Sequence, residues 1–284
     1  MRKFTVALCQ MDSRDDKQAN LAMAAGLIDE AAAKGAAVAA FPETVNFIGK
    51  GYKYQAEPIP GPTSDFFCAQ AKRTGMWIVS GSFPEEDPSG KPKNTMLLID
   101  PEGNIRGRYS KLHMFDVEIA NGPSYMESAR NTAGDGIVLA DTPMGRFGFA
   151  ICYDLRFDEM FRLMALNGAQ VIFIPSSFTM NTGKDHWEPL MRARAIENGV
   201  YMVGPCQIGE KTGMNAYGKS MVVDPWGNVI AKAGDRPCCV TAEIDLDYLD
   251  AVRAQVPSLF NRREDLYSVS GSRVEIVGDC GKKP

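Results

Sequence analysis

The chain has 284 residues, 45% of them hydrophobic and 23% charged, which is typical of a folded globular protein and excludes a disordered or coiled-coil one. The formal net charge of −4 lacks the basic excess of nucleic-acid-binding domains, and the longest apolar runs are too short to span a membrane, so we expect neither partner. An odd number of cysteines (seven) without framework spacing, only two histidines and no secretory signal predict reduced thiols in a cytoplasm and no metal site.

Short apolar runs alternate along the chain with segments of helical periodicity. The apolar runs predict strands at residues 4–9, 36–41, 76–80, 94–100, 105–109, 146–151, 171–175, 201–206, 221–223 and 229–231. Apolar residues at helical spacing predict helices at 21–32, 63–74, 157–167 and 185–198. A glycine lies just after each of these helices, as is typical of a helix C-terminus.

The turn sequence Asp-Pro-x-Gly-Asn occurs twice, at residues 100–104 and 224–228, each time between two predicted strands. Proline presets such a turn, and glycine or asparagine takes a positive φ. The repetition indicates either two similar halves or, more simply, two hairpins that use the same favourable turn. Alternation of strands and helices predicts an α/β fold, and the hairpins predict mixed rather than purely parallel sheets.

No linker, low-complexity segment or block of like charge divides the chain. We therefore expect a single domain over residues 1–284. Residues 245–284 are predicted to form an extended C-terminal tail that packs on another surface or on another subunit.

Motifs of several common enzyme classes are absent. The chain contains no G-x-G-x-x-G, no P-loop, no H-E-x-x-H and no G-x-S-x-G. Dinucleotide, nucleoside-triphosphate, zinc-peptidase and serine-hydrolase functions therefore lack their usual sequence support.

Reactive side chains follow three of the predicted strands within two residues, and these are Glu43, Lys111 and Cys152. Sites of α/β proteins tend to lie at strand ends. A carboxylate can take the proton of a thiol, the thiolate can attack a carbonyl carbon, and an ammonium can stabilise the oxyanion that develops. Each residue also has an ordinary interpretation: an inert buried thiol, a surface carboxylate and a solvated lysine.

Motifs around these positions resemble those of the nitrilase superfamily of carbon–nitrogen hydrolases over nearly the whole chain. The matching segments are Phe-Pro-Glu at 41–43, Tyr-Ser-Lys-Leu-His at 109–113, Cys-Tyr-Asp-Leu-Arg-Phe at 152–157, His-Trp-Glu at 186–188, Arg-Ala-Arg-Ala-Ile-Glu-Asn at 192–198 and Asp-Pro-Trp-Gly at 224–227. The resemblance implies a four-layer αββα sandwich that forms homodimers or higher homo-oligomers, with the C-terminal tail crossing to the partner.

The resemblance also implies a Glu–Lys–Cys triad that needs no cofactor and no metal. Glu43 would be the general base, Cys152 the nucleophile, and Lys111 the oxyanion stabiliser together with a backbone N–H near Tyr153. A second glutamate commonly joins such a triad. Glu127 matches its motif better than the nearby Glu118 does.

The residues after Cys152 resemble the Nit branch, which contains ω-amidase and deaminated glutathione amidase. This implies an amidase that hydrolyses a small linear amide carrying a carboxylate and releases ammonia through a cysteine thioester. An N-carbamoyl amino acid hydrolase, an aliphatic amide hydrolase and a non-catalytic binding or assembly protein on the same scaffold stay open as alternatives.

A carboxylate on the substrate needs a cation, and Arg156 is the leading candidate because a guanidinium binds a carboxylate in bidentate fashion. A structural ion pair, for instance with Glu159, is the competing interpretation of Arg156. Three further residues could line the pocket, namely Tyr52, Thr182 and Lys184. The segment 176–185 departs from the usual Nit sequences, so it leaves open which amide is bound.

Overall fold

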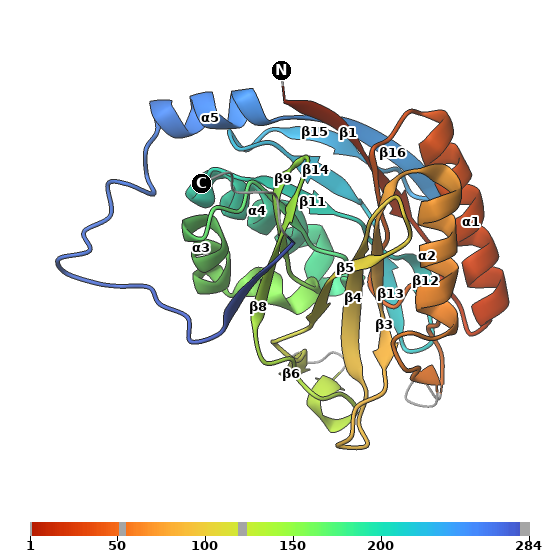
Figure 1. Cartoon of the computed structure of the whole chain (residues 1–284). Coiled ribbons are helices and arrows are strands. Elements are labelled where there is room, and N and C mark those ends of the chain that lie inside the picture. The colour runs from red at the N-terminus through yellow and green to blue at the C-terminus, as the bar shows by residue number, and fades with distance from the viewer. Residues whose placement is uncertain (1, 51–54, 119–123, 279–284) are drawn as a thin grey trace.

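Two large mixed β-sheets pack face to face at the centre of the computed structural model, which describes residues 2–50, 55–118 and 124–278 (Figure 1). The first sheet has the order β16 (Cys238–Asp245), β1 (Lys3–Gln10), β2 (Val38–Ala40), β3 (Trp77–Glu85), β4 (Lys93–Ile99) and β5 (Ile105–Ser110). The second has the order β15 (Val229–Lys232), β14 (Met221–Val223), β11 (Tyr201–Gly204), β10 (Val171–Phe173), β9 (Gly145–Phe149), β8 (Ile137–Thr142) and β17 (Val274–Val277).

Helices cover the outer face of each sheet, which completes the predicted αββα sandwich. Helices α1 (Lys17–Ala33) and α2 (Pro62–Thr74) lie on the first sheet, and α3 (Asp158–Leu166) and α4 (Met180–Asn198) lie on the second (Figure 1). The side chain of Asp16 caps α1, and α2 begins with a proline and ends at Gly75 with a φ of 69°. The predicted α/β class and mixed sheets are confirmed.

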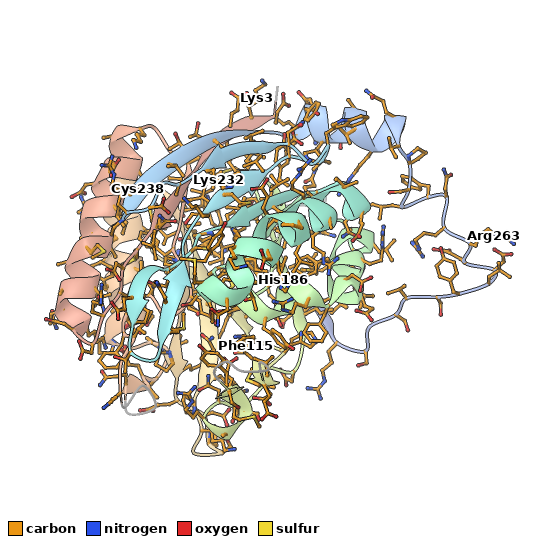
Figure 2. All side chains as sticks on the ribbon, turned by 180° about the vertical axis from the view of Figure 1, so that it is seen from behind. Lys3, Phe115, His186, Lys232, Cys238 and Arg263 are labelled. Atoms are coloured by element: carbon orange, nitrogen blue, oxygen red, sulfur yellow. The ribbon has the colours of Figure 1, made fainter. Side chains whose placement is uncertain are left out.

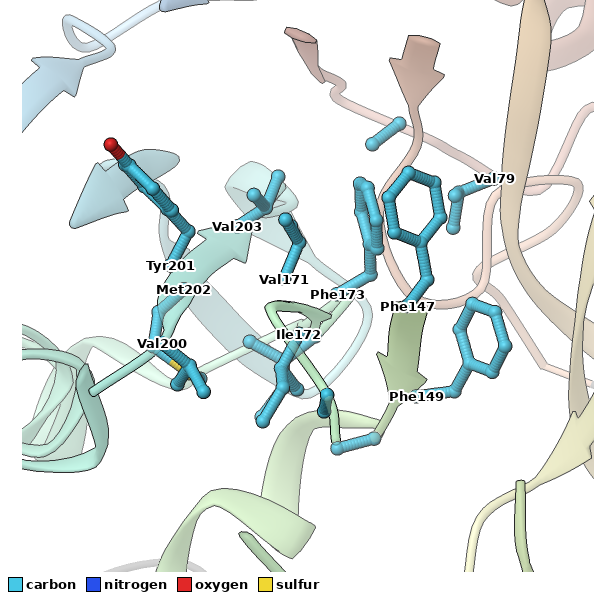
Figure 3. Close-up of a cluster of buried hydrophobic side chains, with 14 of the residues drawn as sticks. Val79, Phe147, Phe149, Val171, Ile172, Phe173, Val200, Tyr201, Met202 and Val203 are labelled. Carbon is cyan, nitrogen blue, oxygen red and sulfur yellow. The ribbon is translucent and has the colours of Figure 1, made fainter. Parts of the chain in front are cut away.

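The larger core lies between the two sheets and is built from their inward-facing apolar side chains (Figure 3). Phe147 and Phe173 of adjacent strands meet edge to face with ring centroids 5.0 Å apart. Because the strands of both sheets are anchored in this core, their carboxyl-terminal ends are held rigidly. A second core joins the first sheet to α1 and α2.

The two repeated turns join β4 to β5 and β14 to β15, as predicted. The predicted start of α4 at 185 is wrong, since the helix begins at Met180. Its early residues include Gly183, which normally disfavours a helix. Here Gly183 is required, because a Cβ would lie 2.5 Å from Cβ of Tyr217.

The C-terminal region is not extended throughout, which corrects the prediction for residues 245–284. It begins with helix α5 (Leu246–Gln255), capped by the Asp245 side chain, and returns to pair β17 in parallel with β8. The role of this region at a subunit interface stays a prediction.

No helix within 2–50, 55–118 and 124–278 combines the length and apolar character that crossing a membrane requires.

Candidate active site

Loops that follow three different strands bring the predicted reactive residues together. Glu43 follows β2, Lys111 follows β5, and Cys152 begins the short 3-10 helix η3 (Cys152–Arg156) after β9. Glu43 and Lys111 come from the first sheet and Cys152 from the second, so the site lies where the two sheets meet. All three line one cavity of about 390 Å³.

Lys111 lies between two carboxylates and is almost completely buried. Its Nζ is 2.9 Å from Oε1 of Glu43 and 2.8 Å from Oε2 of Glu127. Burial by itself lowers the pKa of Lys111, but the charges of Glu127 and Glu43 outweigh it and hold that pKa well above its ordinary value. Lys111 is therefore a fixed positive charge in the site.

Glu43 is held in place through both carboxylate oxygens. Oε1 also accepts a hydrogen bond of 2.9 Å from Nδ2 of Asn94, and Oε2 accepts one of 2.9 Å from the backbone N–H of Ser177. The side chain of Gln207 donates to the backbone carbonyl of Glu43 at 3.0 Å. The sequence did not indicate Asn94 or Gln207 as site residues, because each sits on a strand or bridge remote in sequence from the site.

Glu127 reaches Lys111 from the 3-10 helix η2 (Glu127–Ala129). Oε2 of Glu127 accepts a 2.7 Å hydrogen bond from the N–H of Phe115, and Oε1 accepts one of 3.2 Å from Asn131. Glu118, the competing candidate, is exposed on β6 (Asp116–Glu118), which pairs with β7 (Ser124–Met126). The structure thus places Glu127, and not Glu118, beside Lys111.

Cys152 lies at a sharp turn with a φ of 49°, a strained value for a residue other than glycine. Burial and the nearby Glu43 raise the pKa of the thiol well above its ordinary value, against the opposing effect of Lys111. The resting thiol is therefore protonated, and its proton must leave when sulfur attacks. Because the Cys152 N–H donates to the carbonyl of Pro175 at 3.0 Å, that N–H is not available to an oxyanion.

Asp154, completely buried, fixes the turn that carries Cys152. One oxygen accepts hydrogen bonds from the Tyr109 hydroxyl at 2.7 Å and the Ile151 N–H at 2.8 Å. The other accepts from the N–H of His113 at 3.0 Å and lies 2.8 Å from its Nδ1. Asp154 thereby ties the Lys111 segment to the Cys152 turn, a positioning role that its place in the motif did not reveal.

The structure places several of the predicted site residues on the cavity wall and one of them away from it. Tyr153, Arg156 and Thr182 line the cavity. Lys184 does not: it lies on the exposed side of α4, where it pairs with Asp185, because the helical turn that directs Thr182 inward directs Lys184 outward. Tyr52 lies outside the described residues.

Arg156 has no carboxylate partner among the described residues, so the ion pair considered for it is not found. Its guanidinium lies 3.3 Å from Nδ1 of His186 on α4, and its Cζ lies 5.9 Å from the ring centroid of Tyr153 and 5.7 Å from that of Phe178. His186 is labelled in Figure 2. A second guanidinium, of Arg130, also lines the cavity and was not predicted. In the described ranges, no group of three or more His, Cys, Asp or Glu residues is arranged to hold a metal ion.

The family model for carbon-nitrogen hydrolases matches residues 5–254, which include every residue of this constellation. The chain belongs to the carbon–nitrogen hydrolase family. It is therefore an enzyme that hydrolyses carbon–nitrogen bonds.

Similar proteins place this hydrolase in the Nit branch, as the motifs predicted. It is 41% identical over 273 residues to omega-amidase NIT2 of Xenopus tropicalis, covering 95% of this chain and 98% of that one. It is 40% identical over 269 residues to the deaminated glutathione amidase of Synechocystis, covering 92% and 99%. Nit3 of Saccharomyces cerevisiae, a nitrilase-superfamily member of branch 10, has a TM-score of 0.83 at 31% identity, covering 92% of this chain and 96% of that one.

A buried lysine of the hydrolase anchors the hairpin of β12 (Ile208–Lys211) and β13 (Met214–Tyr217), whose tip at 212–214 lines the cavity. Nζ of Lys211 lies 2.5 Å from Oδ1 of Asp12 and 3.0 Å from the carbonyl of Ser13. Burial lowers the pKa of Lys211 to about 8, although Asp12 opposes this.

This pKa makes the stability of the fold depend on pH. Because the folded value lies below the ordinary 10.5, the folded protein loses the proton first, and the free energy of unfolding rises with pH between about 8 and 10.5. Across this pH window, we expect the free energy of unfolding of the wild type to rise by about 1–3 kcal/mol more than that of Lys211→Met. Urea unfolding of both proteins at pH 8 and pH 10 measures the difference, and an equal pH response in both would contradict it.

Proposed function

We propose that the enzyme is an amidase that hydrolyses a small linear amide carrying a carboxylate and releases ammonia through a thioester on Cys152. The observation that carries the proposal is the buried Glu43–Lys111–Cys152 constellation in a cavity that also holds Arg156, which has no carboxylate partner within the described part of the chain. The named activities of the two relatives above, ω-amidase and deaminated glutathione amidase, support the same class of substrate.

Acylation begins with transfer of the Cys152 proton to Glu43 as sulfur attacks the amide carbon. The amide π electrons move onto oxygen, and Lys111 neutralises the charge that develops there. The backbone N–H of Tyr153 has no backbone acceptor within the described part of the chain, and it is the second donor. Glu43 then gives its proton to the departing nitrogen, and ammonia leaves a thioester behind.

Deacylation uses the same carboxylate as a base. Glu43 takes a proton from water while the hydroxide attacks the thioester carbon, and Cys152 leaves as the acid forms. Glu127 does not meet the reacting atoms in this scheme. It keeps Lys111 charged and in position through their 2.8 Å ion pair.

Arg156 is the residue that we assign to the substrate carboxylate. Arg156→Gln is expected to raise KM for a carboxylate-bearing amide about 10- to 100-fold with a smaller change in kcat, because a charge-assisted hydrogen-bonded pair is lost. Lys184→Gln is the matched control, since Lys184 is an exposed cation on α4 that lies outside the cavity. An unchanged KM in Arg156→Gln would move the assignment to Arg130.

Ammonia release from a small panel tests the proposal. The panel contains α-ketoglutaramate, deaminated glutathione, a simple aliphatic amide, an N-carbamoyl amino acid and a nitrile. Release from one of the two keto-acid amides is the expected result. Release only from the carbamoyl compound or only from the aliphatic amide would replace the proposal with that alternative. If no compound of the panel released ammonia, a non-catalytic binding or assembly protein would be favoured.

A homodimer in a reducing cytoplasm completes the proposal. Large apolar side chains are exposed near α5 and the turn after β14, including Ile196, Trp226, Val256 and Phe260. Exposed apolar clusters of this kind support burial against a second subunit. Light scattering coupled to gel filtration is expected to give twice the mass of the chain, and the mass of a monomer would contradict the dimer.

A further inference from the structure

Two cysteines lie directly opposite each other on neighbouring strands, far along the chain from Cys152. Cys9 of β1 is the register partner of Cys239 of β16 in an antiparallel pair. Further along the same two strands, the N–H of Leu246 donates to the carbonyl of Arg2, so Arg2 and Leu246 form a hydrogen-bonded pair. Counting along the ladder, Cys9 and Cys239 form a non-hydrogen-bonded pair, in which facing side chains approach most closely.

This position matches the geometry of a disulfide. Cα atoms of a non-hydrogen-bonded pair are about 4.5 Å apart, within the roughly 4.4–6.8 Å range that disulfides span. Both side chains point to the sheet face covered by α1, where Sγ of Cys9 lies 4.0 Å from the carbonyl of Leu27. No large backbone movement is needed to join the two sulfur atoms.

The surroundings favour reaction at Cys239 rather than at Cys9. Cys9 is fully buried, whereas Cys239, which is also buried, lies at the edge of a surface hollow that Lys34 and Arg236 line as well. The neighbouring Cys238, at the same end of the sheet beside α1, is seen in Figure 2. A hydrogen bond from Cys9 lowers the pKa of Cys239 against the effect of burial, and the charge of Lys34 adds to this. Nζ of Lys34 is held there by a 2.6 Å hydrogen bond to the Cys239 carbonyl.

We propose that Cys9 and Cys239 form an oxidisable dithiol, a modification site separate from the catalytic cysteine, which a hydroperoxide converts to a cross-strand disulfide. The Cys239 thiolate attacks one peroxide oxygen, which gives a sulfenic acid and releases an alcohol or water. The Cys9 thiol then attacks that sulfur, the S–S bond forms and water leaves. The two sulfurs together lose two electrons to the peroxide, so the product is reversible by thiols.

The other cysteines that the structure describes lack such a partner. Cys238 points to the opposite face of the strand from Cys239, because side chains alternate along a strand. Cys68 lies on α2 and Cys206 follows β11, and neither has a cysteine as its register partner. Cys68 therefore serves as the matched control position.

The test is peptide mapping after treatment with hydrogen peroxide, with free thiols blocked by N-ethylmaleimide in denaturant. Wild type and Cys152→Ala are both expected to yield linked Cys9 and Cys239 peptides that dithiothreitol separates. Cys68→Ala should give the same link, and Cys239→Ala should lose it. In the Cys152→Ala protein, which cannot oxidise at the nucleophile, oxidation is expected to raise Tm by roughly 5 °C, and dithiothreitol to reverse the rise.

Should Cys239→Ala fail to fold, Cys9→Ala takes its place and should leave Cys239 as a sulfenic acid that dimedone labels. The proposal would be overturned if, at a peroxide dose that oxidises Cys152, N-ethylmaleimide still labelled Cys9 and Cys239 as fully as Cys68. A disulfide from either residue to any other cysteine would overturn it as well. None of these outcomes depends on the amidase activity.

Discussion

Lys111→Met is expected to lower kcat/KM by about 10³-fold or more and to destabilise the fold by about 3–5 kcal/mol. The loss of rate follows because Lys111 is the charged donor assigned to the oxyanion. The loss of stability follows because Glu43 and Glu127, both within 3 Å of Nζ, would remain as neighbouring carboxylates without their shared cation.

Urea unfolding and ammonia release measure the two effects on the same preparation. Lys184→Met is the matched control, because it removes a lysine that is exposed and pairs only with its neighbour Asp185. We expect this control to change stability by less than about 0.5 kcal/mol. A Lys111→Met protein that is as stable as the control would mean that the two glutamates are not held as an ion-paired cluster.

Cys152→Ala is expected to abolish turnover, with a loss of about 10⁴-fold or more in kcat, while the fold remains. Of the described residues that line the cavity, only Cys152 carries a thiol that could form the proposed thioester. Cys206→Ala removes another buried thiol, one that does not line the cavity, so its kcat should stay close to that of the wild type.

Thermal unfolding distinguishes a catalytic loss from an unfolded protein. The Tm of Cys152→Ala should lie within a few degrees of the wild type, since only one buried sulfur is removed. Ammonia release by Cys152→Ala at more than about a hundredth of the wild-type rate would exclude Cys152 as the nucleophile.

The positions of reactive residues just after predicted strands indicated which side chains meet, because the ends of strands in α/β folds lie together at one edge of the sheet. Glu43, Lys111 and Cys152 could be found in this way, and the family motifs added Glu127. The repeated turns and the mixed sheets could also be predicted, since both follow from local residue preferences.

The rest of the site depends on contacts that no local pattern encodes. Gln207 reaches Glu43, and the hairpin tip at 212–214 reaches the cavity, only because the two sheets stack. The error at Lys184 arose because the helix was predicted to start only at residue 185. Once Met180 begins a helix, the helical phase and not the sequence position decides which side chains face the cavity.

The C-terminal region shows the same limit. Strand β17 pairs with β8 at the edge of the second sheet. Figure 1 shows the long loop that leads from α5 to this strand. Such pairing between distant segments is set by the exposed edge of β8, and residues 274–277 alone carry little sign of it.

Partitioning of the acyl group between water and hydroxylamine tests the thioester most directly. The amide and the methyl ester of one keto acid are hydrolysed at a fixed hydroxylamine concentration, and the ratio of hydroxamate to acid is measured for each. If both substrates pass through the same thioester on Cys152, the two ratios must be equal, whichever step limits the rate. Unequal ratios, or acid as the sole product from both, would contradict the covalent mechanism.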